Sequence, residues 1–343
     1  MQSIEVAGVT VKPGEMKHIE MPVAKLYTNT DMSMPVVIYH GKKAGPTVFV
    51  SAAIHGDELN GIEIIRRLMK QKNFRISKGT LILVPIVNIY GVLNQSRYLP
   101  DRRDLNRSFP GSAKGSLAAR VADKFFTDIV NLCSYGIDLH TGAIHRTNLP
   151  QVRADLKDDE TRELAEVFGV PVLLNSDLRD GSLRHAAVES GTKILLYEAG
   201  EALRFDELSI RAGVKGVMNV LSHLGLIIRK SRRRKTTPFI ANNSTWVRAN
   251  SSGIVQDLKQ LGDSVMKDEN LAKIFSPMGE ELGVVKASKT GIIIGKQNIP
   301  LVQEGEAMFH VAYFSEDEDA VVEEIERMQD TLLPEYSVPL DVS

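Results

Sequence analysis

The chain has 343 residues, of which 43% are hydrophobic and 25% are charged, and its formal net charge is -1. This composition is typical of a globular protein with a sizeable core, and the balanced charge gives no overall attraction to nucleic acid or membrane. Six cations lie within residues 229–235 without interleaved aromatic residues, so a solvated linker is expected there rather than a nucleic-acid site. No apolar run reaches about 18 residues, so no transmembrane helix is expected. The N-terminus lacks a signal-peptide pattern and Cys133 is the single cysteine, which together predict a cytoplasmic protein.

The first half of the chain predicts an α/β fold. Residues 1–46 alternate apolar and polar side chains between Pro-Gly turns, which is typical of antiparallel β structure. Residues 47–54 form an apolar run, the apolar residues of 58–70 recur at helical spacing, and a second apolar run follows at 80–88. Strand, helix and strand in this order predict a βαβ unit with parallel strands.

The same alternation continues to residue 224. Residues 89–115 lack periodicity but combine arginines and amides with a Phe-Pro-Gly sequence, so we expect a functional loop there. The segments 143–160 and 199–206 carry no decisive pattern and are expected to be loops that set the depth of a substrate pocket. Helices are expected at 116–131, 158–168, 181–190 and 206–224, and strands at 135–140, 170–174 and 192–201.

The pattern changes in the last third of the chain. From about residue 242 to 312, short strands alternate with glycine turns, which predicts a small all-β module. We place the main domain at 1–235, the β module at 236–314 and an acidic helical tail at 315–343.

Polar side chains stand at the ends of three predicted strands. His55 follows the first strand, with Glu58 one turn later, and His140 and Glu198 end two later strands. Because α/β sheets keep their ligand sites at the carboxyl ends of parallel strands, we expect these side chains to converge. Two imidazoles and one carboxylate, with a position left for water, are how a catalytic zinc ion is held.

Such a site predicts hydrolysis. Zinc lowers the pKa of its bound water to about 7 and polarises a carbonyl group. A further carboxylate, not bound to the metal, would take the proton of this water and pass it to a leaving amine. Glu198 suits this role because it comes from a different strand. Asp138 lies two residues before His140 on the same strand face, so we expect it to accept a hydrogen bond from that imidazole.

The motifs around these residues form a recognisable series: His55-Gly-Asp-Glu58-x-x-Gly61, Arg97, Asp104-Leu-Asn-Arg107-x-Phe-Pro-Gly111, Asp138-Leu-His140-Thr-Gly142 and Tyr197-Glu198-Ala-Gly200-Glu201. From about residue 30 to about 312, the chain resembles the succinylglutamate desuccinylase/aspartoacylase family. The resemblance implies a zinc carboxypeptidase-like fold, with a mixed, mostly parallel sheet flanked by helices. It also implies that the C-terminal module is a biotinyl/lipoyl-like barrel sandwich. The expected turn at 276–281 lacks the lysine of a carrier domain, so we interpret this module as a structural or gating cap.

The resemblance also implies an activity, a zinc-dependent amidohydrolase with one zinc ion per chain. Its expected substrate is a small anionic N-acyl amino acid, or a similar amide, from which it removes the acyl group. By position, His55, Glu58 and His140 match the metal ligands, and Glu198 matches the general base.

Several arginines match substrate-binding positions of the family. Arg97 matches the arginine that polarises the scissile carbonyl, and Arg102 and Arg103 compete with it for this role. The pair that holds the substrate carboxylate is matched by Asn106 with Arg107, whose guanidinium can meet a carboxylate bidentately. A second substrate-contacting arginine is matched by Arg184.

Two other functions fit the same residues. A zinc carboxypeptidase that trims acidic C-terminal residues would use the same metal site with a more open cleft. A binding protein of the same fold that has lost its chemistry is the second alternative, against which the intact metal ligands and Glu198 argue. The acyl group and the amino acid do not follow from the sequence. Nor does the oligomeric state, and a homo-oligomer is compatible with the chain.

Overall fold

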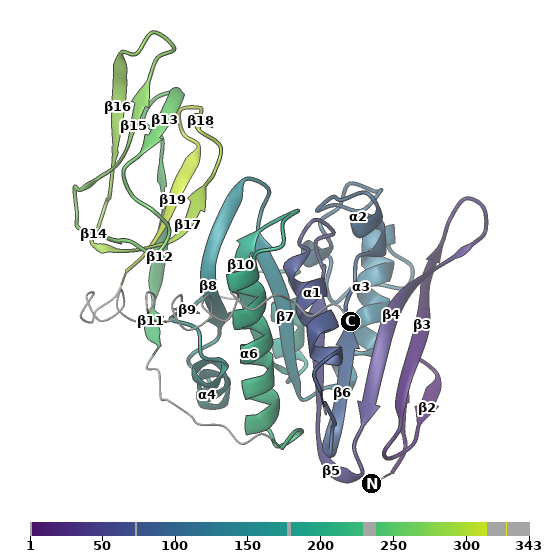
Figure 1. The fold of residues 1–343 in the computed structure, drawn as a ribbon. Helices are drawn as coiled ribbons and strands as arrows, with labels where there is room; N and C mark the ends of the chain where they lie inside the picture. Colours follow the sequence, from purple (N-terminus) through teal and green to yellow (C-terminus); the bar gives the residue numbers. More distant parts are fainter. Residues whose placement is uncertain (1, 73, 177–179, 229–237, 314–326, 328–343) are drawn as a thin grey trace, which may run out of the picture.

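Figure 1 shows the chain as a computed structural model, which describes residues 2–72, 74–176, 180–228, 238–313 and residue 327. The predicted linker 229–235 and, apart from residue 327, the predicted helical tail 315–343 lie outside the described residues. None of the described helices is long and apolar enough to cross a membrane.

Four parallel strands form the centre of the fold. They pair in the order β10-β7-β5-β6. Each is rich in apolar residues because helices cover both of its faces. Their bounds are β5 (Lys43–Ala52), β6 (Lys78–Val84), β7 (Tyr135–Gly142) and β10 (Lys193–Glu201).

Antiparallel strands extend this centre at both edges. The hairpin of β3 (Met16–Lys25) and β4 (Asp31–His40) continues the sheet beyond β6. On the other edge, β8 (Arg146–Ala154) pairs antiparallel with β10, and β9 (Val172–Asn175) pairs parallel with β8. The expected fold class, a mixed, mostly parallel sheet flanked by helices, is therefore confirmed.

Helices pack on both faces of the sheet (Figure 1). Side-chain oxygens at the N-caps Ser116, Asp158, Ser182 and Asp206 accept backbone N–H groups of the first turn, which explains where four of these helices begin. The bounds are α1 (Asn60–Met69), α2 (Ile89–Leu93), α3 (Leu117–Asp128), α4 (Asp159–Phe168), α5 (Leu183–Glu189) and α6 (Glu207–His223), with 3₁₀ turns at Leu105–Arg107 and Val130–Leu132.

The alternation of side chains along β7 separates a structural face from a functional one. Ile137 and Leu139 point into the core cluster that includes residues of α1, α4 and α6. Asp138 and His140 therefore point to the opposite face, where residues of α3 and α5 form a second core cluster. This face, at the carboxyl end of the parallel strands, is where the candidate site lies.

The C-terminal strands continue the main sheet. β17 pairs with β8, and the parallel strand β11 pairs with β9, so residues 239–313 are hydrogen-bonded to the α/β part. Strands β13, β15, β16 and β18 form a separate four-stranded sheet. The bounds are β11 (Phe239–Ala241), β12 (Asn243–Arg248), β13 (Gly253–Asp257), β14 (Ser264–Val265), β15 (Asn270–Phe275), β16 (Glu281–Lys286), β17 (Gly291–Gln297), β18 (Leu301–Val302) and β19 (Ala307–Tyr313); a short β1 (Ile4–Val6) and β2 (Val9–Val11) pair at the N-terminus.

Two predicted loops contain regular structure. The segment 143–160 holds all of β8, where Pro150 and a row of polar residues obscure the apolar alternation of a strand. The segment 89–115 begins with α2, which is only one and a half turns long and therefore shows too little periodicity to be recognised.

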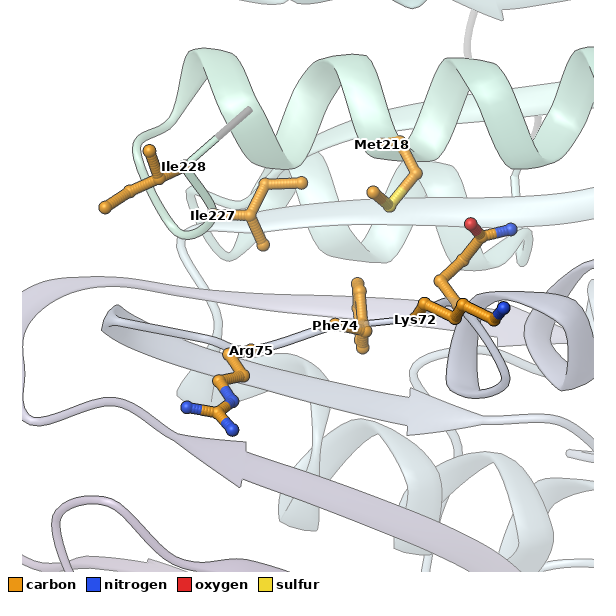
Figure 2. A pocket seen from close by; sticks show the side chains of 7 residues that line it. Lys72, Phe74, Arg75, Met218, Ile227 and Ile228 are labelled. Carbon is orange, nitrogen blue, oxygen red and sulfur yellow. The ribbon is translucent and has the colours of Figure 1, made fainter. Parts of the chain in front are cut away.

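A surface hollow lies near the C-terminal ends of α1 and α6, away from the carboxyl ends of the parallel strands (Figure 2). Phe74 and Ile227 line it, together with Lys72 and Arg75. Among the described residues, its lining contains no carboxylate, imidazole or hydroxyl group, so these residues offer neither a ligand of the zinc-site kind nor a proton acceptor for hydrolysis.

Candidate metal centre and active site

The turn between β5 and α1 presents His55 and Glu58. β5 ends at Ala52, two residues earlier than predicted, because the buried Ala53 takes a left-handed conformation with φ 54°. The backbone N–H of Val87 donates to the Ala52 carbonyl, and the next residue, Asn88, donates to Ala53. These bonds hold a strained backbone in place, as is common at functional sites.

Three ligand atoms converge at this turn. The Nδ1 atom of His55 lies 2.6 Å from Oε1 of Glu58, and Nδ1 of His140 lies 2.7 Å from Oε2 of the same carboxylate. All three side chains are buried, and their ligand atoms lie within 4.8 Å of one another. The backbone N–H of Thr141 also donates to Oε2 of Glu58. Two imidazoles and a carboxylate are the donor set of catalytic zinc sites, so these residues fit that ion.

The electrostatics of the cluster reflect this close approach. Burial raises the pKa of Glu58, but the attraction of both imidazoles outweighs it and holds this pKa well below its usual range. Burial lowers the pKa of each imidazole, and neighbouring carboxylates outweigh it, so the pKa values of His55 and His140 are raised. Glu58 thus stays ionised, as a metal ligand must.

A carboxylate orients each imidazole from its outer side, and it is buried in the case of Asp138 and partly buried in the case of Asp104. Asp138 Oδ2 lies 2.7 Å from Nε2 of His140, as the sequence predicts, and Asp138 is itself held by the hydroxyl of Ser51. Asp104 Oδ1 lies 3.1 Å from Nε2 of His55. Asp104 has no role in the sequence prediction, although it opens the Asp-Leu-Asn-Arg motif. The two carboxylates together leave both Nδ1 atoms directed at Glu58.

Arg97 lies beside the three ligands. Its guanidinium is 3.6 Å from Glu58 Oε1, and its Nε and Nη2 atoms both contact Oδ2 of Asp104. Arg102 and Arg103, the competing candidates, are exposed, and Arg103 faces Asp101. The geometry therefore favours Arg97 as the guanidinium that can reach a carbonyl group at this site.

Glu198 approaches from the neighbouring strand. In the parallel pairing of β10 with β7 it stands opposite His140, so both side chains lie on the same face of the sheet. Its Oε2 atom accepts a hydrogen bond of 2.9 Å from Asn148 Nδ2 and lies 3.2 Å from a guanidinium nitrogen of Arg153. These two β8 residues were not predicted as part of the site.

The remaining predicted residues meet where the 105–107 turn packs against α5. Asn106 is buried, and its side-chain oxygen accepts the backbone N–H of Leu183. Arg107 is exposed and donates to the Asn106 carbonyl. Arg184 is buried and donates to the Ser176 carbonyl at the end of β9. These residues contact one another or the strand ends, and none has a hydrogen bond to the three ligand side chains among the contacts of the described residues.

The comparisons agree with this geometry. The profile of the succinylglutamate desuccinylase/aspartoacylase catalytic domain matches residues 44–224. The N-alpha-acetyl-L-2,4-diaminobutyric acid deacetylase of Halomonas elongata is 26% identical over 281 residues, which cover 78% of this chain and 82% of that protein. A product-bound structure of the ectoine utilization protein EutE (DoeB) from Ruegeria pomeroyi has a TM-score of 0.78 at 23% identity, covering 87% of this chain and 95% of its own. A succinylglutamate desuccinylase/aspartoacylase from Rhodobacter sphaeroides has the same TM-score at 22% identity, covering 88% and 95%.

An α/β fold with buried imidazoles and carboxylates at its strand ends defines a hydrolase of linear amide bonds, and the relatives are named for that activity. The chain belongs to the succinylglutamate desuccinylase/aspartoacylase family, because the matched catalytic domain spans more than half of it. The family predicted from the motifs is thus confirmed.

Proposed function

We propose that the protein is a zinc-dependent deacylase that removes the acyl group from a small N-acyl amino acid. The observation that carries this proposal is the convergence of His55, Glu58 and His140 within 4.8 Å, with Glu198 at the end of the adjacent strand. The name of the Halomonas elongata relative describes the removal of an acetyl group from an amino acid, which supports this class of substrate.

In this proposal His55, Glu58 and His140 hold one zinc ion per chain. When bound, zinc supplies Lewis acidity, which polarises a carbonyl oxygen and makes water a nucleophile near neutral pH. The outer carboxylates Asp104 and Asp138 keep the two imidazoles in one orientation.

The chain supplies the proton transfers and the substrate contacts. Glu198 takes the proton of the attacking water and delivers it to the nitrogen of the leaving amino acid. Arg97, fixed against Asp104, donates to the oxygen of the scissile carbonyl as negative charge develops there. The side-chain oxygen of Asn106 accepts the backbone N–H of Leu183 in α5, so its NH₂ group is the part that would donate to the substrate. With Arg107 it would hold the α-carboxylate, and Arg184 would contact the far end of the substrate.

Metal analysis and a substrate panel test the proposal. We expect about one equivalent of zinc in the purified protein and loss of activity on chelation, with recovery when zinc is returned. The panel contains N-acetylaspartate, N-succinylglutamate and Nα-acetyl-2,4-diaminobutyrate, with peptides that end in acidic residues as the comparison. Hydrolysis of peptides alone would assign a carboxypeptidase instead, and metal-loaded protein that cleaves neither class would be a binding protein.

A further inference from the structure

We propose that Asn148 and Arg153, supported by the C-terminal strands, position Glu198 for proton transfer. This inference rests on the proposed function, in which Glu198 is the proton acceptor. Both contacts reach the same oxygen, Oε2, from β8, which lies next to β10. Within the described residues, Oε1 has no hydrogen-bond partner. One oxygen of the carboxylate is therefore anchored, and the other is left to accept a proton.

The anchor consists of a hydrogen bond from Asn148 and an ion pair with Arg153, and it needs both contacts. A single hydrogen bond leaves a carboxylate free to rotate about its last side-chain bond, whereas an amide hydrogen bond together with an ion pair to a guanidinium on the same oxygen restricts this rotation. Arg153 is partly exposed and Asn148 is 7% exposed, so water competes weakly with the amide contact. The geometry of a proton acceptor decides its efficiency, since a misplacement of about 1 Å can lower the rate about 100-fold.

Asn148 in turn lies against a C-terminal strand. It pairs with Gly295 of β17, and a Cβ atom at Gly295 would stand 2.9 Å from Oδ1 of Asn148. The pairing continues from Gly295 to His310 of β19 and from His310 to Trp246 of β12. The last two rings stack with centroids 4.7 Å apart. A continuous row of residues thus leads from the C-terminal strands to the side chain that holds Glu198.

The C-terminal strands act, on this view, as part of the catalytic apparatus. They contribute no group to the reacting atoms; they fix the position of Asn148, which fixes Glu198. Asn148 and Arg153 are positioning residues, so their loss should lower kcat and leave the metal and the substrate contacts of Asn106 and Arg107 unchanged.

The test uses the full chain, zinc-loaded, and the panel substrate that the wild type cleaves fastest. For Asn148→Ala we expect kcat to fall roughly 10- to 100-fold with KM and zinc content unchanged. Asn148→Asp, which has the same shape but presents an oxygen to Oε2, should lose at least as much. The matched control is Thr147→Ala, the next residue of β8, whose hydroxyl accepts a bond from Asn298 and does not contact Glu198. It should keep the wild-type kcat.

A double-mutant cycle tests the link to the C-terminal strands. Gly295→Ala should lower kcat in the wild-type chain and lower it much less when Asn148 is already alanine, because the crowded oxygen is then absent. Additive losses would overturn that link. Wild-type kcat in Asn148→Ala and Asn148→Asp, or an equal loss in Thr147→Ala, would overturn the anchor while deacylation stands. A wild-type protein that cleaves no N-acyl amino acid would instead refute the proposed function together with this inference.

Discussion

At the residue scale, the candidate centre is organised by carboxylates that face imidazoles from both sides. Glu58 lies at hydrogen-bond distance from the inner nitrogen of each ring, while Asp104 and Asp138 lie against the outer nitrogens. Contacts at both nitrogens fix the orientation of each ring. Asp104 also holds Arg97 and so links this guanidinium to the His55 ring.

Asp104→Asn should weaken zinc binding. The variant keeps the volume of the side chain, but it has one acceptor oxygen instead of two and lacks the negative charge that attracts the His55 ring. We therefore expect zinc affinity to fall roughly 10- to 100-fold. Competition with a chromogenic chelator measures this. Asp101→Asn is the control, because Asp101 lies in the same loop and contacts Arg103 and α3 rather than an imidazole. Equal zinc affinity in both variants would contradict an orienting role for Asp104.

Glu198→Gln should abolish turnover and leave zinc bound. Glutamine fits the same space and can still accept from Asn148, but it cannot take a proton, so we expect kcat to fall roughly 100- to 10,000-fold. Zinc content and steady-state kinetics are measured on the same preparation. Glu201→Gln, on the same strand but bonded to His145 and Asn298, serves as control and should remain active. If Glu198→Gln kept its activity, the proton acceptor would lie elsewhere.

At the element scale, α6 packs against the sheet and α4 through small residues. A Cβ atom at Gly216 would stand 2.1 Å from the ring of Phe168, which belongs to α4 and is buried. Gly216→Ala gains about 1 kcal/mol of helix propensity but overpacks this contact at a cost of about 1 to 3 kcal/mol. We expect a net loss of about 1 kcal/mol in the free energy of unfolding, measured by chemical denaturation. Lys215→Ala, on the exposed side of α6, should not lower stability, and a more stable Gly216→Ala would show that α4 can move aside.

Elements with strong periodicity could be predicted from the sequence, and so could the residues at their ends. The unit β5-α1-β6 is parallel as expected, and the ends of β5 and β7 bring His55 and His140 to one edge. β8 could not be predicted, because Asn148 and Arg153, which contact Glu198, interrupt its apolar residues Leu149, Val152 and Ala154 and so hide the strand pattern.

The same limit explains the missed side chains. Asn148 and Arg153 lie on β8 and meet Glu198 only through the antiparallel pairing with β10, which local sequence does not specify. Asp104 could have been found, since it stands in a quoted motif two residues before Asn106, but its partner His55 is 49 positions away in the chain. Pairings between distant segments are decided by packing of the whole sheet rather than by local propensity.

At the scale of the whole molecule, one continuous sheet connects the residues of the candidate site with the C-terminal strands. β17 and β19 bury apolar residues against β9 and β11, so the two parts share a core cluster as well as hydrogen bonds. His310 lies within this shared region, 5% exposed and stacked on Trp246. Burial, with a smaller contribution from the Arg153 charge, lowers the pKa of His310 to about 3.

This buried neutral imidazole predicts an acid-dependent loss of stability. An unfolded chain has a histidine pKa near 6.5, so between about pH 6.5 and about pH 3 the unfolded state binds a proton that the native state does not. At about one pH unit below 6.5, His310 should therefore lower the free energy of unfolding by about 1.4 kcal/mol. Above pH 7 it should have no effect on this free energy.

Denaturant unfolding at pH 7.5 and pH 5.5 of the wild type and of His310→Phe isolates the effect. Phenylalanine can keep the stack on Trp246 but does not titrate. Between the two pH values, the free energy of unfolding of the variant should therefore fall by about 1.4 kcal/mol less than that of the wild type. The fluorescence of Trp246, the one tryptophan of the chain, reports on the stacked ring directly. An identical pH dependence in both proteins would contradict the prediction, because it would mean that His310 takes up a proton as readily in the native protein as in the unfolded chain.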